Sequence, residues 1–170
     1  MKFLIITGVM AAIMFAGCSK NASSCGSTTS PTAQADILQP ALTAWQQGDK
    51  ATAVSNFLAA DWSGRPSSVS GSILSLTKDQ YHALSDADRQ AKSVQVTAQL
   101  KVLRDMTEHG VEQAGLDAAS KGDSAQARKC FMSLKQCGTA LDRPDVMQIV
   151  QLTGQAIKKI ADKEMAKIGQ

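Results

Sequence analysis

Aromatic side chains are scarce in this 170-residue chain, where phenylalanine, tryptophan and tyrosine together make up 4% of the residues. Sheet proteins use aromatic and β-branched residues to fill a pleated, half-buried surface, so the scarcity argues against a β-sandwich. An excess of charge of one sign is also lacking. The formal net charge is +3 and the two signs are interspersed, so there is no basic stripe of the kind that binds nucleic acid. We therefore expect no nucleic acid among the partners.

Residues that commonly carry catalysis or bind metals are few. The two histidines, His82 and His109, have no carboxylate or cysteine at metal-ligand spacing, and His109 with Asp105 is more simply a surface pair of helical neighbours. The chain has no Gly-x-Ser-x-Gly elbow, no P-loop and no dinucleotide fingerprint. The sequence therefore predicts no metal, no cofactor and no catalytic residue, and we expect the protein not to be an enzyme.

The four cysteines do not form an obvious disulfide framework. Cys130 and Cys137 are seven residues apart, which is about 10 Å along a helix and beyond disulfide reach unless the helix ends between them. Gly138 predicts an end just after Cys137, so a bridge would need distortion. Buried thiols are the favoured interpretation.

The first residues have the pattern of a secretory signal peptide. Lys2 supplies a positive start, residues 3–17 are apolar apart from Thr7 and two glycines, and a polar segment follows Cys18. A run of about 15 residues is shorter than the roughly 20 that a spanning helix needs. Export is therefore expected.

The residues Phe15-Ala16-Gly17-Cys18 resemble the lipobox of bacterial lipoproteins, although that family usually has Leu where this chain has Phe15. The resemblance implies a lipid on the Cys18 sulfur, cleavage after Gly17 and a membrane as the first partner. Several acyl chains, at about 0.8 kcal/mol per buried methylene, anchor more firmly than one. The alternative is ordinary cleavage near Ala16 or Ala22, with Cys18 lost or left as a free thiol. By family analogy Ser19 favours the periplasmic face of the outer membrane in a two-membrane cell.

Three segments follow from these patterns: a signal peptide at 1–17, a Ser- and Thr-rich flexible tether at 18–33, and an all-helical domain at 34–170. Apolar residues recur at helical spacing in the third segment, and no stretch alternates like a strand. Asp61 to Gly71 is expected to be a loop, and Thr77-Lys78-Asp79-Gln80 has capping-box spacing. A long helix is expected from Ser85 to Gly122, and its apolar positions include Val94, Ala98, Val102, Met106, Val111, Ala114 and Ala118. Asp123 should cap a helix through Gln136, and Pro144 should open the last one.

The chain contains an internal repeat. Residues 41–57 and 115–131 share seven identities, among them Gly48/Gly122, Asp49/Asp123, Ala53/Ala127 and Phe57/Phe131. In each copy glycine permits a left-handed turn, aspartate caps the next helix, alanine lets its partner helix approach and phenylalanine fills the hairpin. The pattern resembles the tetratricopeptide half-motif, but no Trp or Tyr marks sit on the first helix and the copies are 74 residues apart. The resemblance implies antiparallel helical hairpins whose concave face binds a protein or peptide.

The sequence thus predicts an all-α, membrane-tethered lipoprotein of the cell envelope that acts as a protein-binding adaptor. Trp62, beside the expected loop, is a candidate anchor for the partner, whereas Trp45 is expected in the core. The alternative is a structural lipoprotein that self-associates, with the C-terminal helix forming the contact or packing on a membrane. Four lysines near the end are expected to form the solvated face of that helix: Lys158, Lys159, Lys163 and Lys167.

Overall fold

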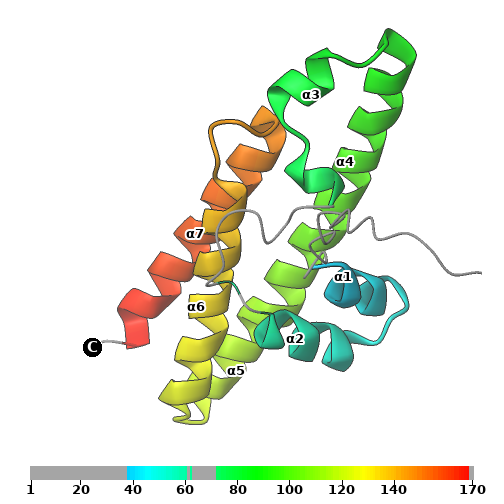
Figure 1. Ribbon diagram of the computed structural model, residues 1–170. Helices are drawn as coiled ribbons and strands as arrows, with labels where there is room; N and C mark the ends of the chain where they lie inside the picture. The colour runs from blue at the N-terminus through cyan, green and yellow to red at the C-terminus, as the bar shows by residue number, and fades with distance from the viewer. Residues whose placement is uncertain (1–37, 61, 63–71, 169–170) are drawn as a thin grey trace, which may run out of the picture. The chain divides into compact units, whose positions relative to one another are not determined.

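The computed structural model describes residues 38–60, 62 and 72–168, and the elements in these ranges are helices (Figure 1). No strand occurs in the described part of the chain, where Thr77 and Val146 form an isolated bridge. The prediction of an all-α fold is confirmed. Cys18, the tether and most of the expected 61–71 loop lie outside the described residues. The elements are α1 (Gln39–Gln46), α2 (Lys50–Ala59), the 3-10 helix η2 (Ile73–Ser75), α3 (Lys78–His82), α4 (Asp86–Met106), the π-helix η3 (Thr107–Glu112), α5 (Gln113–Ser120), α6 (Ser124–Leu141) and α7 (Gln148–Ile168).

Side-chain caps fix where several helices begin. Thr77 and Gln80 form the predicted capping box at α3, with Gln80 N donating to Thr77 Oγ1 and Thr77 N donating to Gln80 Oε1. The side chain of Ser85 accepts a hydrogen bond from Asp88 N and caps the start of α4. The first turn of α4 carries Asp86 and Asp88, whose negative charge is favourable at a helix N-terminus. These starts are the ones that the sequence predicted.

The expected helix from Ser85 to Gly122 is helical throughout, but its middle is a π-helix that the sequence pattern did not predict. Helix α4 continues through η3 into α5, and the wider turn of η3 holds Thr107, Gly110 and Val111 in the core. A π-turn accommodates one more residue than an α-turn, so it changes which side chains face inward on either side of it.

Only some of the apolar positions of α4 lie in the core. Val94 is 65% exposed and Ala98 is also exposed, whereas the buried side chains of α4 are Val96, Leu100, Leu103 and Met106. Val102 is partly buried and packs against the core. Helix α4 therefore carries two apolar stripes, and the one with the larger side chains turns inward.

The ends of α6 and α7 also differ from the prediction. Helix α6 runs through Gly138 to Leu141 instead of ending near Cys137, because Gly138 lies where the backbone of α7 approaches. Helix α7 begins at Gln148, four residues after Pro144. Lys78 N donates to Asp145 O at 2.8 Å, which ties the linker between α6 and α7 to the start of α3.

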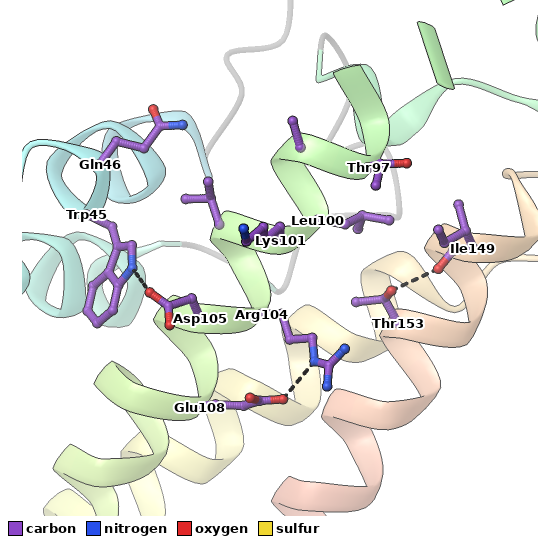
Figure 2. A pocket seen from close by; sticks show the side chains of 12 residues that line it. Trp45, Gln46, Thr97, Leu100, Lys101, Arg104, Asp105, Glu108, Ile149 and Thr153 are labelled. Carbon is purple, nitrogen blue, oxygen red and sulfur yellow. Dashed lines mark hydrogen bonds and ion pairs between the residues drawn. The ribbon is translucent and has the colours of Figure 1, made fainter. Parts of the chain in front are cut away.

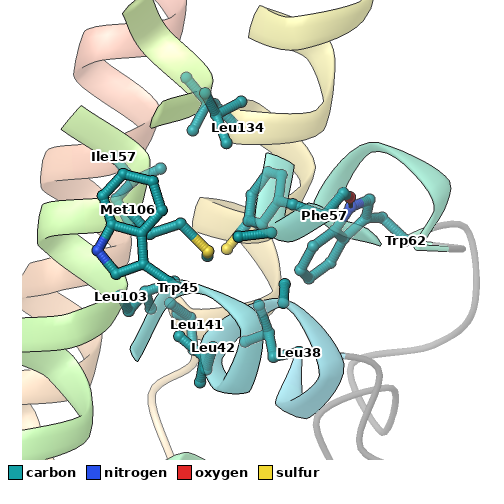
Figure 3. Packing of buried hydrophobic residues seen from close by; sticks show 14 of the residues in the cluster. Leu38, Leu42, Trp45, Phe57, Trp62, Leu103, Met106, Leu134, Leu141 and Ile157 are labelled. Carbon is teal, nitrogen blue, oxygen red and sulfur yellow. Dashed lines mark hydrogen bonds between the residues drawn. The ribbon is translucent and has the colours of Figure 1, made fainter. Parts of the chain in front are cut away.

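The core lies where α1 and α2 pack against α4, η3 and α6 (Figure 3). Phe57 and Phe131 are its largest fully buried side chains. Trp45 is buried as predicted, and its ring lies over Gly110 of the π-turn, where an added Cβ would stand 2.8 Å from the ring. The π-turn thus brings a bare backbone to the indole.

Candidate partner-binding surface

The two copies of the repeat form turns of nearly the same geometry. Gly48 has φ +83° and Gly122 has φ +77°, the left-handed region that favours glycine. Asp49 and Asp123 follow with φ −82° in both copies, and each carboxylate accepts from a backbone N–H three residues on, at 3.0 and 2.9 Å. The predicted turn and cap roles of these four residues agree with this geometry.

The alanine and phenylalanine of each copy are buried where the repeat predicts packing. Ala53 and Phe57 are fully buried on α2, and Ala127 and Phe131 occupy the corresponding positions of α6. In the second copy the ring of Phe131 lies against Gly115, where a Cβ would stand 2.7 Å from it. The first hairpin pairs α1 with α2 and the second pairs α5 with α6, and the long helix α4 separates them along the chain.

Trp62 does not occupy the exposed position that we expected of a partner anchor. Its side chain is 8% exposed, its ring centroid lies 5.2 Å from that of Phe57, and its indole N–H donates to the Phe57 carbonyl oxygen at 3.3 Å. In this position the tryptophan ring packs against another aromatic ring, and its N–H has a hydrogen-bond acceptor. Trp62 is a core residue that covers the end of α2.

The large apolar side chains that are exposed in the described residues lie instead on α4, α5, α6 and α7, and α7 carries two of them. Ile149 and Leu152 of α7 are 44% and 54% exposed. Helix α7 contacts α4, on which Val94 is likewise an exposed apolar residue. An open pocket of about 1050 Å³ has Ile149 in its lining (Figure 2). Its lining comes from α1, α4, η3 and α7: Trp45, Gln46, Thr97, Ala98, Leu100, Lys101, Val102, Arg104, Asp105, Glu108, Ile149 and Thr153.

Polar side chains at the pocket are arranged in two groups. The indole N–H of Trp45 donates to Asp105 Oδ2 at 2.8 Å, and Asp105 Oδ1 lies 3.2 Å from His109 Nδ1. The exposed Asp105–His109 contact is the surface pair that the sequence predicted, and Trp45 is a third member that the spacing did not indicate. Arg104 Nε donates to Glu108 Oε1 at 2.9 Å.

A buried carboxylate lies near the C-terminal end of α7. Glu164 of α7 is 4% exposed, and both of its oxygens accept from Lys167 Nζ at 2.7 Å. This hydrogen bonding holds the pKa of Glu164 below its usual value against the opposite effect of burial. Glu112 of η3 has its pKa raised, first by burial and then by the charge of Glu164. No group of three or more potential metal ligands occurs in the described ranges.

The C-terminal lysines are mostly paired, as expected of a solvated helix face. Lys158 Nζ binds Asp142 Oδ2 at 2.9 Å, and Lys163 and Lys167 both lie beside Glu164. Cys130 and Cys137 are free and buried on α6, in agreement with the favoured interpretation. Burial raises the pKa of both thiols.

The chain matches no protein-family model, no curated protein and no solved structure. Among the helices in the described ranges, none combines the length and the apolar character needed to cross a membrane.

Proposed function

We propose that this protein is an exported lipoprotein, held at a membrane of the cell envelope by a lipid on Cys18, whose helical domain binds another protein. The apolar segment before Phe15-Ala16-Gly17-Cys18 supports the anchor. The observation that carries the binding role is the exposed apolar surface of α4 and α7, with Val94, Ile149 and Leu152 between 44% and 65% exposed. Apolar side chains gathered on one face of a folded domain often mark an interaction site.

The anchor is tested by metabolic labelling with a palmitate analogue in a bacterial host. The full-length chain is expected to incorporate the label, and Cys18→Ser is expected to lose it and to leave the membrane fraction. Cys25→Ser is the matched control, because polar residues rather than an apolar run precede Cys25. Labelling that survives in Cys18→Ser would show that the lipid site is wrong.

The binding role is tested by in-cell crosslinking and purification of the full-length protein beside Cys18→Ser. One reproducible envelope protein that is captured with the native chain, and is lost or replaced when the anchor is removed, is the expected result. Capture of copies of the chain alone would contradict the adaptor proposal.

Self-association is the second candidate, because the same exposed residues of α7 would suit contact between two copies. Deleting α7 is a poor test, since Val150, Ile157 and Ala161 are buried in the core and the deletion would expose it. Leu152→Asp is a better test, because this side chain is 54% exposed. A self-associating protein would show concentration-dependent oligomers in sedimentation velocity that Leu152→Asp abolishes, with Leu116→Asp on α5 as control.

A further inference from the structure

Basic residues are concentrated on the last two helices of the domain. Helix α6 contains three lysine or arginine residues and no aspartate or glutamate, and α7 contains four lysines and two acidic residues. The other described helices together contain six basic and seven acidic residues. Because α6 and α7 pack side by side (Figure 1), the excess of positive charge belongs to one part of the domain.

Not all of this charge is used in ion pairs within the domain. Four of the seven basic residues lie close to a carboxylate: Lys135, Lys158, Lys163 and Lys167. The other three, Arg128, Lys129 and Lys159, are exposed and have no hydrogen-bond or ion-pair partner in the part of the chain that the structure describes. These three cations are therefore available to an acceptor outside the domain.

The unpaired cations of α6 surround an exposed apolar side chain. Met132 is 42% exposed, and Arg128 and Lys129 precede it by four and three residues, so their side chains neighbour it on the outer side of the helix. Lys135 follows Met132 by three residues and extends the same side. An apolar side chain among cations is typical of helices that lie in the interface of a membrane.

An ion pair continues this side of α6 onto α7. Lys135 Nζ lies 2.8 Å from Asp162 Oδ1. Asp162 follows Lys159 by three residues, so the unpaired Lys159 lies on the side of α7 that borders α6. The outer side of the two helices is thus one surface, which we call the basic face: Arg128, Lys129, Met132, Lys135 and Lys159.

The proposed anchor is long enough to let this face reach a bilayer. Twenty residues of chain lead from Cys18 to Leu38, and a chain of this length spans at most about 65 Å. The longest continuous helical run, from the start of α4 to the end of α5, is about 50 Å long. The anchor therefore permits any side of the domain to meet the membrane, and the charge of the domain selects the side that does.

We infer that the basic face lies against the membrane that holds the lipid of Cys18, with Arg128, Lys129 and Lys159 binding the phosphates of anionic lipids and Met132 in the interfacial layer. The inference rests on the proposed lipid anchor and adds the orientation of the domain. A lipid and a cationic surface together hold a protein more firmly than either alone, because the lipid keeps the headgroups at high local concentration. An acidic partner protein is the competing occupant.

The orientation is tested with the lipidated full-length protein in vesicles of phosphatidylcholine, with or without phosphatidylglycerol. A photo-crosslinking amino acid at Met132 should crosslink to lipid in the anionic vesicles, and several-fold less in neutral vesicles or at high salt. Val94 of α4, which is 65% exposed, is the control position and should give little lipid crosslinking. Equal yields at the two positions, or a yield at Met132 that does not depend on phosphatidylglycerol, would overturn the inference.

The role of the unpaired cations is tested by combining Arg128→Gln, Lys129→Gln and Lys159→Gln. Lipid crosslinking at Met132 should fall about tenfold or more, because each basic residue near an anionic surface strengthens binding about fivefold. A matched control combines Lys50→Gln, Lys92→Gln and Lys101→Gln, which removes the same charge from α2 and α4 and should leave the yield unchanged. An equal effect of the two triple variants, with unchanged circular dichroism, would show that the basic face is not the docking surface.

Failure of the anchor and failure of the orientation give different results. A purified chain that carries no lipid by mass spectrometry and does not float with the vesicles would overturn both. A lipidated chain that floats with anionic vesicles but does not crosslink to lipid at Met132 would leave the anchor in place and overturn the orientation. In cells, capture of an acidic protein at Met132 in place of lipid would assign the basic face to that protein.

Discussion

Gly138 of α6 and Gly154 of α7 face each other where the backbones of these two helices pack closely against one another. A Cβ on Gly154 would stand 2.6 Å from the Gly138 carbonyl oxygen, and a Cβ on Gly138 would stand 2.7 Å from the Gly154 carbonyl oxygen. Real Cβ atoms do not approach backbone this closely. Only glycine at both positions permits the observed packing of α6 on α7.

We expect Gly154→Ala to lower the free energy of unfolding by about 1–3 kcal/mol, the usual cost of adding a methylene to a packed interior. The direction of the change in stability is informative. Without the close helix contact, alanine in a helix interior would be favoured over glycine by about 1 kcal/mol. Urea denaturation followed by circular dichroism measures the change. A stabilised Gly154→Ala protein would mean that the helices do not meet at this glycine.

Gly122→Ala should destabilise the protein by about 1–2 kcal/mol, the cost of a left-handed conformation for an L-residue. Gly122 has φ +77° and nothing within 4 Å of an added Cβ, so the loss comes from the backbone and not from a clash. Gly122→Asn should lose less, because asparagine visits this region more readily. Equal losses in the two variants would point to a different cause. The same ranking is expected at Gly48, which has φ +83°.

The local signals of the sequence were reliable where one residue determines one piece of backbone. The turns at Gly48 and Gly122 and the capping box at Thr77 could be predicted because their geometry depends on short-range hydrogen bonds and on φ. Gly138 was misread for the same reason. A glycine near a helix end and a glycine at a helix crossing look alike in sequence, and only the position of α7 distinguishes them.

Choosing between two faces of one helix was beyond the sequence. Val94-Ala98-Val102 and Val96-Leu100-Leu103 both fit helical spacing, and spacing alone does not say which of the two stripes faces the core. The π-turn at η3 adds to the difficulty, since it is stabilised by tertiary contacts such as that of Trp45 with Gly110. Spacing also gave no sign of the Trp45–Asp105 bond, which joins residues 60 apart.

The thiols of Cys130 and Cys137 should not react with an aromatic disulfide reagent while the protein is folded. Both are buried on α6, and burial raises the thiol pKa, so little reactive thiolate forms. In a Cys18→Ser, Cys25→Ser background, we expect a slow reaction limited by opening of the structure and release of two equivalents in denaturant. Immediate reaction of one thiol would place it at the surface. Absence of reaction in denaturant would mean that the two cysteines are joined.

Two glutamates should give opposite pH dependences of stability. The folded-state pKa of Glu164 is lowered, chiefly by its hydrogen bonds from Lys167, so its contribution is complete above the unfolded pKa and is lost as pH falls through the folded pKa. The folded-state pKa of Glu112 is raised, chiefly by burial, so stability falls as pH rises from the unfolded pKa to the folded one.

These signs are tested by urea unfolding at a series of pH values between about 3 and 6, the range around the ordinary carboxyl pKa. Compared with the native chain, Glu164→Gln should lose less stability on acidification. It removes a carboxyl group that is harder to protonate in the folded state than in the unfolded state. Glu112→Gln should lose more stability on acidification. It removes a carboxyl group that is easier to protonate in the folded state than in the unfolded state, and whose protonation therefore stabilises the fold. Parallel curves for all three proteins would show that neither carboxylate changes its pKa on folding. Exchanged signs would place Glu112 and not Glu164 against the lysines of α7.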